Sequence, residues 1–116
     1  MVESDYEKSL MDEIIRLKEE KDIIVFAHNY QRPNIQKISD LIGDSLFLAK
    51  KINKMGSNSK ILYATVKFMA ETGAVLNEEA QIYFPQPEAL CPMALQCKPE
   101  LLKKYKKENP GVPIVL

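Results

Sequence analysis

His28, the only histidine of the chain, and Tyr30 stand two residues apart at the end of an apolar run. That run, residues 23–27, is rich in large and β-branched side chains and predicts a buried parallel strand. In open α/β sheets, ligands collect just beyond the carboxyl ends of the strands. An imidazole and a phenol held there could bind a ligand and exchange protons with it. The alternative is that His28 is a loop residue that only bonds a neighbouring helix end or carbonyl.

A second candidate binding element is Gly43-Asp44-Ser45, which interrupts a helical pattern of apolar residues. Asp and Ser are among the best helix-capping residues, so we expect one helix to end here and another to begin after Asp44 or Ser45. A single helix that tolerates Gly43 at a cost of about 1 kcal/mol fits the same pattern. A helix N-terminus with a hydroxyl can bind an anion, which makes Ser45 a candidate ligand, although a plain cap is the simpler interpretation.

The two cysteines, Cys91 and Cys97, lie six residues apart. This spacing is neither a C-x-x-C metal or redox pair nor a disulfide framework. In a reducing compartment both would remain thiols, available as metal ligands or nucleophiles. The plainer interpretation is a pair of buried, small apolar residues.

Composition narrows the class of protein. The chain has 116 residues, enough for one domain, and its 16 basic residues balance its 16 acidic ones. This balance favours neither nucleic acid nor an anionic membrane as a partner. The polar, acidic N-terminus is unlike a signal peptide, and no apolar run approaches the roughly 20 residues that span a bilayer. We therefore expect a soluble cytoplasmic protein.

The elements that must position these residues follow from apolar periodicity and turn residues. Helices are predicted at residues 6–20, 35–42, 46–52, 68–76 and 99–109, and strands at 23–27, 60–66, 81–84 and 113–116. Asn34 is the expected N-cap of the second helix. Alternating helices and strands predict an α/β fold with a parallel sheet covered on both faces.

The last predicted helix and strand repeat the order of the first pair, which suggests a duplicated unit. The sequence ends inside the apolar run Pro113–Leu116. An open terminal strand of this kind invites partners or aggregation. We expect the sequence to be the N-terminal part of a longer protein.

Five short segments carry a resemblance to a known family. They are Ala27-His28-Asn29-Tyr30-Gln31, Ile35-Gln36, Gly43-Asp44-Ser45-Leu46, Phe68-Met69-Ala70-Glu71 and Cys91-Pro92-Met93-Ala94. In this order they resemble quinolinate synthase of type A, the iron–sulfur enzyme of de novo NAD biosynthesis. The resemblance spans nearly the whole chain, which would be about the first third of such an enzyme.

The resemblance implies both a fold and a reaction. The family condenses iminoaspartate with dihydroxyacetone phosphate, with loss of water and phosphate, to give quinolinate. Its fold is a set of three similar three-layer αβα domains, each with a small parallel sheet, around a 4Fe–4S cluster. By this resemblance, residues 1–97 are the first domain, and residues 98–116 begin the second with a helix and a truncated strand.

The resemblance also implies roles for four residues. His28 and Ser45 match substrate-binding residues, Tyr30 matches a catalytic general acid and base, and Cys91 matches one ligand of the cluster. Cys97 matches no ligand. The other cluster ligands lie outside the chain, so we expect it to be inactive without the missing domains or a companion chain. The alternatives are a small, non-catalytic α/β anion-binding module and a remnant that binds no ligand.

Overall fold

The centre of the fold is a parallel sheet. The computed structural model describes residues 4–115, which contain four strands: β1 (Ile23–His28), β2 (Leu41–Gly43), β3 (Lys60–Ala64) and β4 (Gln81–Tyr83). All neighbouring strands are parallel and their order is β2-β1-β3-β4. Because β1 and β3 lie at the centre, the segments that follow them emerge side by side at one edge of the sheet. The α/β class predicted from the sequence is confirmed.

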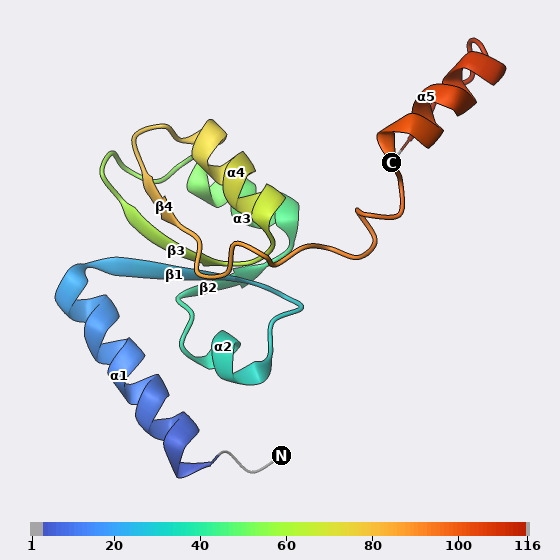
Figure 1. Cartoon of the computed structure of the whole chain (residues 1–116). Helices are drawn as coiled ribbons and strands as arrows, with labels where there is room; N and C mark the ends of the chain where they lie inside the picture. Colours follow the sequence, from blue (N-terminus) through green and yellow to red (C-terminus); the bar gives the residue numbers. More distant parts are fainter. Residues whose placement is uncertain (1–3, 116) are drawn as a thin grey trace.

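Helices cover both faces of this sheet, as Figure 1 shows. The helices are α1 (Asp5–Lys21), α2 (Pro33–Lys37), α3 (Ser45–Ile52), α4 (Lys67–Leu76) and α5 (Pro99–Glu108). α1 and α2 lie on one face, and α3 and α4 pack on the other (Figure 1). The result is a three-layer αβα arrangement, as predicted. None of the helices within residues 4–115 is both long and apolar enough to cross a membrane.

The hydrophobic core lies between the central strands and the α3–α4 layer. Leu48 and Ile52 of α3 are fully buried against Ile61 and Tyr63 of β3. The rings of Phe26 and Tyr63 meet edge to face, with centroids 6.3 Å apart and an interplanar angle of 87°. Aromatic pairs favour this geometry. The contact joins β1 and β3 on the side of the sheet that packs against α3 and α4.

The segment between Pro33 and Gly43 differs from the prediction. We expected a helix over residues 35–42 with Asn34 as its N-cap, but α2 ends at Lys37 and its N-cap is Arg32. Pro33 takes the first helical position, which suits a residue without an N–H group. Residues 41–43 instead form β2 beside β1. The apolar spacing in this segment fits either structure, and pairing with β1 decides between them.

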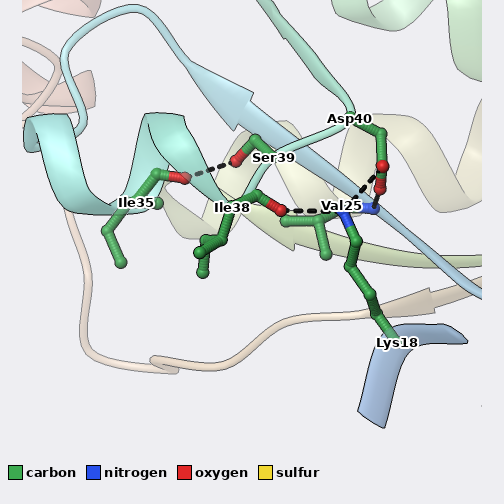
Figure 2. A network of polar contacts seen from close by, with 6 residues as sticks. All are labelled: Lys18, Val25, Ile35, Ile38, Ser39 and Asp40. Atoms are coloured by element: carbon green, nitrogen blue, oxygen red, sulfur yellow. Dashed lines mark hydrogen bonds and ion pairs between the residues drawn. The ribbon is translucent and has the colours of Figure 1, made fainter. Parts of the chain in front are cut away.

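Asp40, the residue just before β2, bonds to Val25 of β1 through both its backbone and its side chain, as Figure 2 shows. Its backbone N–H donates to the carbonyl of Val25 at 2.8 Å, and its Oδ2 accepts from the Val25 N–H at 2.8 Å. Its other oxygen, Oδ1, lies 2.7 Å from the ammonium of Lys18, which also donates to the Ile38 carbonyl at 2.9 Å. One carboxylate therefore satisfies a buried strand amide and ties α1 to the sheet.

The helix start expected after Gly43 is confirmed, and the single-helix alternative is wrong. The segment before Gly43 is β2, however, and not the end of the helix expected there. Asp44 is the N-cap of α3, where its Oδ1 accepts from the Phe47 N–H at 2.8 Å. Gly43 is required by close packing, because a Cβ at this position would collide with the Phe47 ring. The other predicted helices and strands occur within a few residues of their expected bounds, except at the C-terminus.

The C-terminal arm, residues 98–115, stands away from the sheet (Figure 1). The radius of gyration is 17.7 Å, whereas a compact chain of this length has about 13 Å. Residues 112–115 do not belong to a strand, so the strand expected at 113–116 is wrong for its first three residues, and Leu116 lies outside the described residues. The suggested helix–strand repeat therefore lacks its strand, and the domain boundary at 97/98 stays a prediction.

Candidate functional site

A cavity of about 350 Å³ lies beyond the carboxyl ends of β1 and β3. Its lining combines the turn after β1, the start of α3, the β3–α4 junction and the proline-rich loop, residues 85–97, which follows β4. The lining residues are His28, Tyr30, Gln31, Ser45, Thr65, Val66, Phe68, Met69, Leu90, Cys91 and Pro92. The structure thus brings together all four residues singled out from the sequence, although Ser45 and Cys91 come from separate elements.

His28 and Tyr30 form a compact pair at this cavity. The Tyr30 backbone N–H donates to Nδ1 of His28 at 3.2 Å. The two rings meet edge to face, with centroids 4.7 Å apart and an interplanar angle of 62°. In a neutral imidazole whose Nδ1 accepts a hydrogen bond, the proton is on Nε2. His28 can therefore present an Nε2–H donor to a ligand, beside Tyr30, a residue that is 92% exposed.

The turn that carries this pair is fixed by backbone and side-chain bonds. The Asn29 N–H donates to the Gly43 carbonyl at 2.9 Å, which extends the β1–β2 pairing by one residue. The Gln31 N–H donates to the His28 carbonyl at 3.0 Å and closes the turn. The side-chain amide of Gln36 then donates to the carbonyls of Asn29 and Gln31, at 2.9 and 3.0 Å. Sequence reasoning gave Gln36 no role, because only the folded chain shows which carbonyls it reaches.

Ser45 lies at the first position of α3, directly after the Asp44 cap. Ser45 is exposed and lines the cavity. The Asp44 carboxylate already accepts from the Phe47 amide in the same first turn. Gly43 allows this placement, since its missing Cβ leaves room for the Phe47 ring behind the turn. Ser45 can therefore offer a hydroxyl at a helix N-terminus, a position that favours negative charge.

Thr65 is a cavity residue that sequence reasoning did not select. It is 5% exposed and directly follows β3, and its hydroxyl donates to the Met69 sulfur at 2.8 Å. A thioether is a weak hydrogen-bond acceptor, so a stronger acceptor in the cavity could take over this donor. The signal in the sequence was available: a polar residue at the carboxyl end of a predicted strand.

Cys91 is half-buried at the edge of the cavity, in the proline-rich loop. The Lys67 N–H donates to the Ala89 carbonyl at 2.9 Å and anchors this loop to the start of α4. Cys97 is exposed and lines a different hollow, together with α5. Among residues 4–115, no group of three or more His, Cys, Asp or Glu side chains could hold a metal ion. Among the lining residues that the structure describes, Cys91 is the one cysteine, so the cavity offers one thiol.

The cavity suits an anionic ligand. Among the lining residues that the structure describes, no side chain is Asp or Glu, so the wall itself presents no carboxylate to a bound anion. Donors are available from the imidazole of His28, the phenol of Tyr30 and the hydroxyls of Ser45 and Thr65. Val66, Phe68 and Leu90 supply apolar wall, and a partly apolar wall strengthens hydrogen bonds to charge.

Comparison with known proteins confirms the resemblance. The sequence model of the family described as "Quinolinate synthetase A protein" matches residues 12–116. The quinolinate synthase of Thermotoga petrophila is 46% identical over 107 residues, which are 92% of this chain and 36% of that protein. The quinolinate synthase of Pyrococcus horikoshii is 45% identical over 107 residues, or 92% of this chain and 35% of that protein.

A relative from Alkaliphilus metalliredigens, also named quinolinate synthase, is 43% identical over 109 residues, or 94% of this chain and 36% of that protein. The chain thus spans about a third of the length of the curated relatives it matches. The match covers β1 to β4, the cavity and α5. The chain belongs to the quinolinate synthetase A family.

Proposed function

We propose that this chain is the N-terminal part of a quinolinate synthase and is catalytic only together with the domains that it lacks. The reaction would condense iminoaspartate with dihydroxyacetone phosphate to give quinolinate for NAD biosynthesis. Family membership supports this reaction class. The observation that carries the proposal is the single cavity that His28, Tyr30, Ser45 and Cys91 share.

Three of these residues would bind substrate or move protons. The Nε2–H group of His28 would donate to a substrate carboxylate, because Nδ1 already accepts from the Tyr30 amide. The hydroxyl of Ser45 would hold a carboxylate at the N-terminus of α3. The phenol of Tyr30 would transfer protons to and from the bound substrate. Its large exposure in this chain supports a role for further domains in closing the site.

Cys91 would supply one thiolate to a 4Fe–4S cluster. Such clusters take three or four thiolates, and the second cysteine of the chain lines a different hollow, so one ligand is what this chain fits. The remaining ligands would come from the missing domains or a companion chain. When bound, the cluster would supply a Lewis-acid site for the loss of water.

We further propose that the protein acts in the cytoplasm on small molecules, without nucleic-acid or membrane partners. The equal numbers of acidic and basic residues support this view.

The alternative is a non-catalytic α/β module that binds anions at His28, Tyr30 and Ser45. The specific observation in its favour is that these donors lie in one cavity of this chain, whereas the chain contributes one thiol there. A module of this kind would bind small carboxylates without help from any other domain.

The test is anaerobic cluster reconstitution, with and without a polypeptide that contains the remaining two-thirds of the Thermotoga petrophila relative. We expect iron, visible absorbance and quinolinate formation only when the two parts are combined, and their loss in Cys91→Ala but not in the matched control Cys97→Ala. A cluster on the 116-residue chain alone, or equal loss in both variants, would contradict the assignment. Succinate that binds the chain alone at His28, with no quinolinate from the combined parts, would favour the module.

A further inference from the structure

The side-chain amides of Gln36 and Asn77 each bind two backbone carbonyls, Gln36 in the turn after β1 and Asn77 at the end of α3 and in the turn that follows it. The amide of Gln36 donates to the carbonyls of Asn29 and Gln31, at 2.9 and 3.0 Å. The amide of Asn77 donates to the carbonyls of Ile52 and Met55, at 2.9 and 3.1 Å. The chemistry is the same at both places, but only the first loop carries residues of the candidate site.

The carbonyls that Gln36 binds lie on either side of Tyr30 in the chain. The Asn29 carbonyl shares a peptide plane with the Tyr30 N–H, so its bond to Gln36 restrains the direction of that N–H. The Gln31 carbonyl belongs to the peptide plane between Gln31 and Arg32, so the second bond holds the end of the same turn. That N–H is the donor to Nδ1 of His28 at 3.2 Å. The bond determines which imidazole nitrogen carries the proton and therefore which one can donate to a ligand.

Gln36 is itself held in place by the short helix on which it lies. Ile38, just after α2, is 5% exposed, and two residues later the Asp40 N–H donates to the carbonyl of Val25 in β1 at 2.8 Å, which ties this segment to the sheet. The Ser39 hydroxyl donates to the Ile35 carbonyl at 2.6 Å (Figure 2) and closes the end of the helix. The chain of contacts thus runs from the buried sheet through α2 and the Gln36 amide to the turn of His28 and Tyr30.

We propose that Gln36 is a positioning residue that holds the Tyr30 amide against His28 and so keeps the imidazole in its Nε2–H tautomer. This inference rests on the proposed function for its catalytic meaning, but the contact itself does not depend on it. A carboxylate at position 36 would place oxygen against two carbonyl oxygens. A thioether there would fill the same space without a donor. Both changes remove the restraint and leave the bulk of the side chain.

The first test uses the isotope-labelled 116-residue chain and its NMR spectrum. Gln36→Glu and Gln36→Met are compared with Asn77→Asp, which makes the matched amide-to-carboxylate change at the other loop. In both Gln36 variants we expect the His28 imidazole nitrogens to shift toward a mixture of tautomers. The Tyr30 amide should exchange roughly three- to tenfold faster, as expected for the loss of one or two modest hydrogen bonds. In Asn77→Asp both signals should match the wild type, even where stability falls.

An unchanged His28 tautomer in both Gln36 variants, or an equal change in Asn77→Asp, would overturn the inference. Either result would mean that Gln36 only stabilises the turn after β1 and does not determine the tautomer of His28. If a Gln36 variant does not fold, the milder of the two substitutions still reports the tautomer.

The second test measures quinolinate formation with the two-part enzyme. Gln36→Glu should lower kcat/KM about tenfold relative to Asn77→Asp at equal iron content, since Cys91 is untouched. If wild type and variants all fail to form quinolinate while the NMR signals still move, the proposed function fails and the positioning role stands. If wild type is active and Gln36→Glu equals Asn77→Asp in kcat/KM, the catalytic meaning of Gln36 fails and the proposed function stands.

Discussion

The sheet body (residues 23–84) and the C-terminal arm each contain an amphipathic helix of similar length, and these two helices differ in how far their apolar side chains are buried. In α3, Leu48 and Ile52 are fully buried against the sheet. In α5, Leu101 and Tyr105 are 60% and 50% exposed. An apolar stripe predicts that a helix has a face to bury, but the rest of the fold decides whether a surface is there to receive it.

Most of the candidate site lies in the sheet body, and Cys91 lies in the loop between this body and the arm. His28 ends β1, Tyr30 lies in the turn after it and Ser45 begins α3. Cys91 is instead in the loop that leads from β4 toward α5. The body therefore positions the proposed substrate contacts, and one anchored loop positions the proposed metal ligand. Four predictions test this contrast, from the largest effect to the smallest.

Leu48→Ala should destabilise the chain by about 2 to 5 kcal/mol, because it leaves a cavity under α3 where the side chain is fully buried. Urea unfolding followed by circular dichroism measures the change. A loss below about 1 kcal/mol would show that the α3 layer repacks or is not the core of the body.

Tyr63→Phe should change the pH dependence of stability. Burial raises the pKa of Tyr63 from 10.0 to about 12. The folded chain thus holds the phenol proton more tightly than the unfolded chain, and this contribution is complete below pH 10. As the pH rises to about 12 it should be lost, at a cost of roughly 2 to 3 kcal/mol. Unfolding free energies of both proteins across this range should diverge, and parallel curves would contradict the prediction.

Asp40→Ala should cost about 1 to 3 kcal/mol, because it leaves the buried Val25 N–H without its acceptor and removes the partner of Lys18. The matched control is Asp12→Ala, at an exposed position of α1. Urea unfolding should separate the two variants. Equal stability would show that water replaces the carboxylate at the start of β2.

Leu101→Ser should change stability by less than about 0.5 kcal/mol, because its side chain is largely exposed in the arm. The same unfolding assay applies. A loss comparable to that of Leu48→Ala would mean that the arm packs on the body, and the contrast between the two regions would be wrong. The substitution should weaken assembly with the missing domains if they cover α5.

Much of the fold could be predicted because its patterns are local. The apolar run before His28 and the cap at Asp44 each depend on neighbouring residues, and both predictions are confirmed. β2 was missed because Leu41 and Ile42 fit a helical face as well as a strand, and only pairing with β1 distinguishes the two. The strand expected from Pro113 failed for a related reason, since a strand needs a neighbour to bond with.

The class of fold, the family and the identity of the candidate residues could all be inferred from the amino-acid sequence. Side-chain type, apolar period and capping chemistry are properties of short segments, and they are present in the unfolded chain. The folded chain adds that Ser45, Thr65 and Cys91 meet His28 at one cavity and that Gln36 reaches the turn of Tyr30. The physical reason is that these contacts join separate elements, and strand order and helix packing determine which elements meet.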